Sequence, residues 1–305
     1  MPMPLPTYSG GTCPAIAPGR NTIRSGGADR QFLLVVPEGL GESEVLPVMT
    51  VWHHLGGDAE GILEKGGIQA AVNELRMLAI LPEKKGDVRL PIVGSDMCWP
   101  FLDLFDDARV EEEARFWEDM LACVAANYSI NESCVSTVGV SAGALWTAVL
   151  MQTRSERLAS AIVLSGGTGP ALGLGVGDVR RWEGAAHKLP VLVLNGGDTD
   201  QCLVNFEVAS DNLEAGLEAD GHFIEECVHN CGHAVPPVDP AVGLASLYRF
   251  VLDHPYWLSP GTSPYQTSGM PSSAPSWCAI GRGNAVARTG ECTETTADSG
   301  CPVLP

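Results

Sequence analysis

The chain has 305 residues, a length that allows one large α/β domain or two small ones. Its net charge of −19 argues against nucleic acid and against an anionic membrane surface as a partner. Hydrophobic residues make up 45% of the chain, but no apolar run reaches the length of a membrane span, so we expect no membrane insertion. We also expect the protein to be a monomer.

Apolar runs and amphipathic stretches alternate through most of the chain. Residues 1–30 are rich in Pro, Gly and Ser and predict an extended N-terminal arm. The later pattern predicts, in chain order, strand 31–36, strand 45–53, helix 60–75, strand 77–81, helix 110–128, strand 135–140, helix 142–151, strand 158–164, strand 191–195, helix 206–217, strand 222–228 and helix 240–252. This alternation predicts βαβ units and a mostly parallel sheet, the α/β class.

The composition changes after residue 258, where Pro, Ser, Gly and Thr dominate as far as residue 276. Three cysteines follow in the remaining residues. We therefore expect a catalytic domain over residues 31–258, and over residues 259–305 a linker with a small disulfide-held extension.

Ten cysteines are many for a chain of this size, and none of them lies in a C-x-x-C pair. This spacing gives poor support to zinc ribbons and to thioredoxin-like chemistry, and it favours disulfides in an exported protein. One candidate bridge, Cys123 to Cys134, would close a short loop. No signal-peptide pattern opens the chain, so we interpret its start as a mature or recombinant boundary and expect an extracellular location.

The stretch around Ser141 has the strongest chemical signature. Gly139-Val140-Ser141-Ala142-Gly143 is a G-x-S-x-G motif between a predicted strand and a predicted helix. In such an elbow the serine occupies a sharp turn, and the glycines avoid collisions with neighbouring backbone. We therefore predict Ser141 as a nucleophile whose intermediate is stabilised by the first N–H of the following helix.

A nucleophilic serine needs an imidazole base and a carboxylate that orients it. His233 follows the last predicted strand, and it is preferred over His229 as the base. Asp198 and Asp200 both follow strand 191–195, and either could be the acid. The order serine, aspartate, histidine is the order found in α/β-hydrolases.

Four patches extend this pattern: Trp52-His53-His54-Leu55-Gly56-Gly57, Cys98-Trp99, Gly139 to Gly143, and Gly232-His233. With them, residues 31–252 resemble the secreted polyhydroxybutyrate-depolymerase-like branch of the α/β-hydrolases, which also holds feruloyl and acetyl-xylan esterases. The first patch resembles the family's H-G-x-G-G oxyanion loop, with His54 where glycine is usual, and Cys98-Trp99 resembles its C-W element beside the site. The third patch is the elbow, and Gly232-His233 resembles the family's G-H histidine.

The resemblance implies an α/β-hydrolase fold, with Ser141, Asp200 and His233 as the catalytic residues. It also implies oxyanion donors at the backbone N–H groups of Leu55 and Ala142. Trp99 and His54 are candidates for substrate contact, although Trp99 could equally belong to the core.

No cofactor is implied, and no metal site is expected because His53 and His54 lack a third ligand at useful spacing. The predicted function is that of a secreted serine carboxylester hydrolase acting on polymeric or small esters. The substrate is expected to be a polyhydroxyalkanoate or aryl polyester, or else a feruloyl or acetyl ester of plant cell walls. The alternatives outside this class are a serine peptidase and a non-catalytic polymer-binding protein on the same fold.

Overall fold

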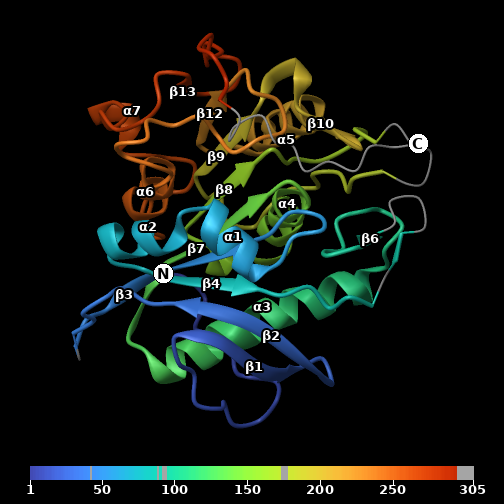
Figure 1. Cartoon of the computed structure of the whole chain (residues 1–305), viewed down its shortest axis with the longest axis vertical. Helices are drawn as coiled ribbons and strands as arrows, with labels where there is room; N and C mark the ends of the chain where they lie inside the picture. The colour runs from blue at the N-terminus through green and yellow to red at the C-terminus, as the bar shows by residue number, and fades with distance from the viewer. Residues whose placement is uncertain (42, 88, 91–94, 173–177, 294–305) are drawn as a thin grey trace.

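The computed structural model describes residues 1–41, 43–87, 89–90, 95–172 and 178–293. Its main sheet contains β1 (Gly19–Ser25), β2 (Ala28–Val35), β3 (Leu46–Trp52), β4 (Leu78–Pro82), β7 (Ile130–Val140), β8 (Ser160–Leu164), β9 (Val191–Asn195), β12 (Ile224–Val228) and β13 (Cys278–Ile280). The spatial order of the strands is β1-β2-β4-β3-β7-β8-β9-β12-β13. Figure 1 shows β1 at the bottom of the view and β13 near the top.

The centre of this sheet is parallel, from β4 through β3, β7, β8 and β9 to β12. The strands β1 and β2 are antiparallel at one edge, and β13 is antiparallel at the other. The predicted class, with a mostly parallel sheet, is confirmed. Two further pairs are much smaller: β5 (Arg89–Leu90) with β6 (Ser95–Asp96), and β10 (Gln201–Cys202) with β11 (Val204–Asn205).

Helices cover both faces of the sheet, and each face has its own apolar core. On one face lie α3 (Asp107–Asn127), α4 (Ala142–Arg154) and α5 (Phe206–Asp220), which contribute Trp117, Trp146 and Leu213 to the larger core. On the other lie α1 (Ala59–Lys65), α2 (Ile68–Leu75), α6 (Ala245–Asp253) and α7 (Tyr265–Ser268). Strands buried on both faces must be apolar throughout, which explains the uninterrupted hydrophobic runs in the sequence. Among the described helices, none has the combined length and hydrophobicity needed to cross a membrane.

The helix predicted over residues 60–75 is two helices, α1 and α2, that meet at Gly66 and Gly67. Gly67 has a φ of 56°, in the left-handed region that glycine adopts without a side-chain penalty. A Cβ on Gly66 would lie 2.7 Å from the carbonyl oxygen of Ile62. The glycine pair therefore ends α1 and redirects the chain, which the apolar periodicity alone did not show.

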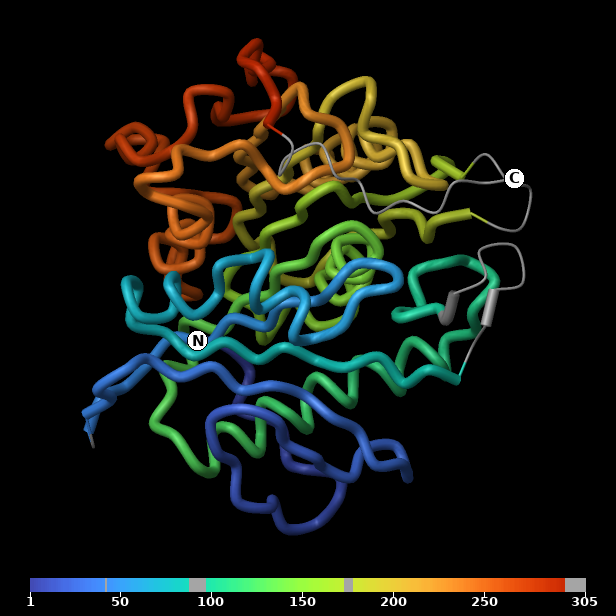
Figure 2. Tube along the Cα trace, viewed as in Figure 1, coloured from blue at the N-terminus to red at the C-terminus, as the bar shows by residue number. Residues whose placement is uncertain are grey.

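The predicted N-terminal arm is wrong for its second half, because residues 19–25 form strand β1 of the main sheet. The first residues are fixed to α3, beside which they lie in Figure 2. Cys13 forms a disulfide with Cys123 of that helix, and the buried carboxylate of Asp119 accepts hydrogen bonds from Ser9 and Ser25. The N-terminal segment is thus part of the domain.

The expected boundary at residue 258 also differs from the structure. Residues 278–280 form β13, which extends the main sheet beside β12, and Cys278 is bonded to Cys227 of that strand. Tyr265 and Trp277 are buried in the core on the α6 face. The described part of the predicted extension is therefore integral to the fold, whereas residues 294–305 with Cys301 lie outside the described residues.

The disulfides confirm an oxidised framework but not the suggested pairing of Cys123 with Cys134. Cys123 pairs with Cys13, and a third bond joins Cys231 to Cys292. Cys134 is a buried free thiol, as is Cys98. Proximity in sequence was misleading here, because Cys123 lies near the end of α3 and faces the N-terminal segment instead of the following strand.

Two buried carboxyl groups, Glu225 in β12 and Glu214 in α5, predict a loss of stability at alkaline pH. Burial raises the pKa of Glu225 to about 8 and, with repulsion from Glu226 and Asp211, that of Glu214 to about 9. Their ordinary value is 4.5, so the folded chain holds protons that the unfolded chain releases. Their contribution to stability is complete below pH 4.5 and is lost as the pH rises through 8 and 9.

We therefore expect the Tm to fall between about pH 5 and pH 9, and Glu214→Gln to flatten that fall because the amide cannot ionise. Measuring the Tm of both proteins by calorimetry across this pH range checks the prediction. The control is Glu218→Gln, an exposed position of the same helix, which should follow the wild-type curve. A Glu214→Gln curve parallel to the wild type would contradict the assignment.

Candidate active site

Ser141 stands at the turn from β7 into α4, as the motif predicts. Its backbone has φ 56° and ψ −121°, a strained conformation for a residue with a side chain. The turn is held by the Ser141 N–H, which donates to the carbonyl of Leu164 at 2.9 Å, and by the Ser141 carbonyl, which accepts from Ala144 and Leu145. The serine is consequently fixed at the carboxyl end of the parallel strands.

The two glycines of the motif are required by close backbone contacts. A Cβ on Gly139 would lie 2.1 Å from the carbonyl oxygen of Gly143, and a Cβ on Gly143 would lie 2.2 Å from that of Trp52. Both distances are far below any real carbon contact, and both neighbours are backbone atoms that cannot move aside. The elbow therefore packs directly against β3, the strand that leads into the predicted oxyanion loop.

The structure brings Ser141, His233 and Asp200 into one hydrogen-bonded row. The Nε2 atom of His233 lies 2.9 Å from the Ser141 Oγ, and its Nδ1 lies 2.7 Å from an oxygen of Asp200. Asp200 is fully buried, whereas the imidazole is slightly exposed at the pocket. In this arrangement Asp200 can accept a hydrogen bond from the Nδ1–H group of His233, which leaves Nε2 unprotonated and able to take the serine proton.

The two candidate acids have different surroundings. The second oxygen of Asp200 accepts from the Ser165 hydroxyl and from the Gly196 N–H, each at 2.8 Å. Asp198 lies in the short 3₁₀ turn Gly197–Thr199 with an exposed side chain. His229, the alternative base, is buried, and burial lowers the pKa of its imidazole to about 4. It lies behind the acid turn, where its Nδ1 accepts the Cys231 N–H.

Two supporting residues were missed in the sequence. Ser165 follows β8 with a φ of 49° and donates to Asp200, while Phe206 stacks on the His233 ring at a centroid distance of 4.4 Å. Phe206 also donates its N–H to the Asp200 carbonyl at 2.9 Å. A serine directly after a buried strand was a usable signal for the first, but the stacking of Phe206 depends on how α5 packs.

Both predicted oxyanion donors border the site. Leu55 lines the pocket beside Ser141, and Ala142 is the first residue of α4. Among the described residues, the N–H groups of Leu55 and Ala142 donate to no acceptor. His54, which replaces the usual glycine, does not have a positive φ, and the left-handed position of this loop is Gly56 at 73°. Histidine is therefore compatible with the loop.

Trp99 does not contact the pocket, contrary to the expectation that it might bind substrate. It is fully buried, packs edge-on against Trp52, and donates its Nε1–H to the carbonyl of His53 at 2.9 Å. This hydrogen bond joins Trp99 to the start of the loop that contains His54 and Leu55. His54 does line the pocket, and its Nδ1 lies 2.9 Å from the backbone carbonyl oxygen of Leu55.

His53 also belongs to the core instead of a metal site. It is fully buried, its Nδ1 contacts the His54 carbonyl at 2.8 Å, and burial lowers the pKa of the imidazole to about 4. Over the described ranges, a cluster with metal-like spacing is formed by Glu225, Cys227 and Cys278. Because the two cysteines are joined in a disulfide, their sulfurs are not available as thiolate ligands.

A narrow cavity of about 100 Å³ opens beside Ser141 and His233. Its walls are mainly aliphatic and aromatic, and they come from α1, the ends of β7 and β8, the chain after His233 and the start of α6. The apolar lining includes Leu55, Ile62, Leu164, Val235, Leu244 and Tyr248. Such a cavity beside a nucleophile suits a short apolar acyl group.

The fold is shared with several solved structures. The chain is 18% identical to native sOPH over 90% of this chain and 98% of that one, with a TM-score of 0.70. A serine-to-cysteine variant of pOPH complexed with DMSO gives 15% identity, 95% and 99% coverage and a TM-score of 0.71. A ferulic acid esterase gives 14% identity, 76% and 95% coverage and a TM-score of 0.57. No protein-family model and no curated protein matches the chain. These similarities confirm the predicted α/β-hydrolase fold.

Proposed function

We propose that this protein is a serine carboxylester hydrolase that works through an acyl-enzyme. The observation that carries this proposal is the continuous hydrogen-bonded row from Ser141 through His233 to Asp200 at the wall of an apolar cavity. The similarity in fold to a structure named as a ferulic acid esterase supports the same class of reaction.

In the first step the Ser141 Oγ attacks the ester carbonyl carbon while its proton passes to His233 Nε2. Asp200, which is buried and accepts from Nδ1, stabilises the imidazolium that forms. The carbonyl oxygen becomes an oxyanion, which the N–H groups of Leu55 and Ala142 stabilise by about 3 kcal/mol each.

The tetrahedral intermediate then collapses. Its ester C–O bond breaks, and the departing alcohol takes the proton from His233 Nε2. Water enters, gives a proton to the same nitrogen, and attacks the acyl carbon, so that the acid is released and Ser141 regains its proton. Every proton in the cycle moves through one imidazole nitrogen, and no cofactor takes part in this scheme.

We propose polyesters or related short acyl esters as the substrates, with feruloyl and acetyl esters of cell-wall polysaccharides as the alternative. The small apolar cavity supports the substrates with a short acyl group, acetyl esters among them. Disulfides in the described part of the chain support an extracellular location, where such bonds persist. A serine peptidase would need charged groups that bind a peptide terminus, and a non-catalytic binding protein would not need the aligned row.

Turnover of p-nitrophenyl acetate and butyrate tests the proposal directly. Turnover of these esters would support the serine-esterase proposal, and aminopeptidase activity would support the peptidase alternative. The absence of both activities would leave the non-catalytic binding protein as the alternative.

The cavity also predicts selectivity by acyl length. We expect a higher kcat/KM for acetate to butyrate esters than for palmitate esters, because a cavity of about 100 Å³ accommodates a short acyl chain but not a long one. Leu244→Ala should raise relative activity on longer esters by removing a wall of the cavity. Leu252→Ala, in α6 but outside the lining, is the control and should leave the acyl preference unchanged. Preference for palmitate in the wild-type protein would contradict the expectation.

A further inference from the structure

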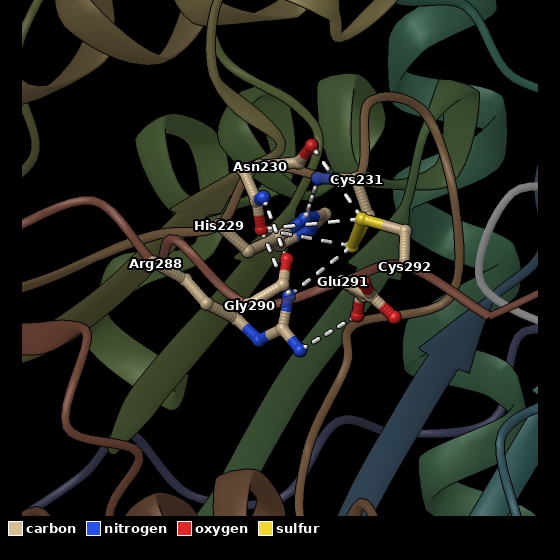
Figure 3. Close-up of a disulfide and its surroundings, with 7 residues drawn as sticks. All are labelled: His229, Asn230, Cys231, Arg288, Gly290, Glu291 and Cys292. Atoms are coloured by element: carbon tan, nitrogen blue, oxygen red, sulfur yellow. Dashed lines mark hydrogen bonds between the residues drawn. A yellow bond between two sulfur atoms is a disulfide. The ribbon is translucent and has the colours of Figure 1, made fainter.

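A contact between distant parts of the chain lies two residues before His233, the proposed catalytic base. After β12 the chain forms the histidine loop, residues 229–233, which ends at His233. Residues 288–292 lie along this loop, as Figure 3 shows, and the Cys231–Cys292 disulfide joins the two segments. The bond is attached only two residues before His233. We call residues 288–292 the C-terminal clamp.

Arg288 is the main polar contact of the clamp. Its backbone N–H donates to the carbonyl of Val228 at 3.0 Å, at the end of β12. Its Nη1 donates to the Asn230 side-chain oxygen at 2.9 Å and to the Gly290 carbonyl, and its Nη2 donates to the Glu291 carbonyl. Figure 3 shows the guanidinium between the loop and the clamp.

Asn230 completes the bridge in the opposite direction. Its amide Nδ2 donates to the Gly290 carbonyl at 2.8 Å, so loop and clamp exchange hydrogen bonds through one side chain. With the disulfide next to it, Asn230 and Cys231 are fixed from the outer side of the molecule. The Cys231–Cys292 disulfide and the hydrogen bonds of Asn230 with Arg288 and Gly290 therefore hold Asn230 and Cys231 to the clamp.

The inner side of the histidine loop is fixed by the turn that carries the acid. His229 donates its N–H to the Asn195 carbonyl at 3.0 Å, and Gly232 donates to the Gly196 carbonyl at 3.1 Å. A Cβ on Gly196 would lie 2.0 Å from the Gly232 carbonyl oxygen, so the two turns are in close backbone contact. Without the clamp, Asn230 and Cys231 would lose the contacts described on their outer side.

We propose that the C-terminal clamp is a positioning element for His233, with Arg288 and the Cys231–Cys292 disulfide as its working parts. It acts on catalysis by fixing the loop against the acid turn, so that Nδ1 stays on Asp200 and Nε2 stays on Ser141. This inference rests on the proposed serine-hydrolase function. Misplacement of a catalytic group by about 1 Å can cost about 100-fold in rate, so a loosened loop should reduce turnover strongly.

The test compares clamp variants with a matched disulfide control. The variants are Arg288→Ala, Arg288→Lys and the double change Cys231→Ser with Cys292→Ser, assayed with p-nitrophenyl butyrate well below each Tm. The control is Cys13→Ser with Cys123→Ser, on the N-terminal segment. That bond spans 110 residues, against 61 for the clamp bond, so its loss should destabilise the fold at least as much.

We expect the clamp variants to lower kcat by about 10- to 100-fold while KM changes by less than about threefold. Arg288→Lys should fall between wild type and Arg288→Ala, because lysine keeps the charge but not the planar fork that serves several acceptors. The control should lose Tm but keep its kcat. Clamp variants with a kcat no lower than the control would overturn the proposal.

A spectroscopic measurement separates this proposal from the proposed function. The proton between His233 Nδ1 and Asp200 should give a downfield proton resonance, identified by its absence from His233→Ala. We expect it to broaden in the clamp variants and to stay sharp in the control. Wild-type protein that hydrolyses no ester would refute the proposed function, and an unchanged resonance in folded clamp variants would refute the clamp.

Discussion

Replacing Ser141 with alanine should abolish ester hydrolysis while the protein remains folded. The hydroxyl is the only group of the row that can form the acyl bond, and the equivalent change in a serine protease lowers kcat by about 2 × 10⁶. Alanine has the same Cβ as serine, so it experiences the same strained φ of 56° and should leave the elbow intact. Measurement of kcat with p-nitrophenyl butyrate, together with a melting curve, checks both parts.

The matched control is Ser160→Ala. Ser160 is also a fully buried serine at the sheet, but its hydroxyl contacts that of Ser136 at 2.9 Å and it is not among the residues lining the cavity. It should melt at a lower temperature and retain its kcat. A fluorophosphonate should add a single label to the wild-type protein, at Ser141, and none to Ser141→Ala. Full activity in Ser141→Ala would end the serine-hydrolase proposal.

Replacing Asp200 with asparagine should lower kcat by about 10⁴, the loss found for the same change in a serine protease. The asparagine amide would donate to Nδ1 instead of accepting from it, which places the imidazole proton on Nε2. A protonated Nε2 cannot take the serine proton, although the geometry at 2.9 Å is unchanged. Kinetics under substrate saturation measures this loss.

Asp198→Asn is the control for Asp200→Asn, because both acids belong to the same turn. The Asp198 side chain is exposed and makes no hydrogen bond within the described part of the chain, so activity and Tm should stay near those of the wild type. The opposite pattern, with Asp198→Asn inactive and Asp200→Asn active, would reassign the acid and leave Ser141 and His233 in place.

The central sheet and the position of the nucleophile could be predicted because each depends on local sequence. The buried parallel strands are apolar throughout, and the elbow needs glycine at two backbone contacts that no other residue permits. β1 was not recognisable because its buried positions are Asn21, Ile23 and Ser25, of which only one is apolar. β1 is instead stabilised by its pairing with β2 and by the hydrogen bond from Ser25 to Asp119.

The remaining misses depend on contacts between distant residues. β13 has three residues, and it is stabilised by pairing with β12 and by the bond from Cys278 to Cys227. A tryptophan beside a cysteine is compatible with a cleft or with a core, and only the contact with the His53 carbonyl places Trp99 in the core. The disulfide partners of Cys13 and Cys231 lie 110 and 61 residues away, beyond any local pattern.

The late position of β13 has a consequence for synthesis on the ribosome. Chains emerge from their N-terminus, and domains begin to fold as they appear. All the parallel strands precede residue 229, so until residues 278–280 arrive β12 is an open sheet edge that can pair with another chain. A nascent or truncated protein that contains Ser141, Asp200 and His233 but lacks β13 would therefore expose an unpaired sheet edge at β12, which favours aggregation.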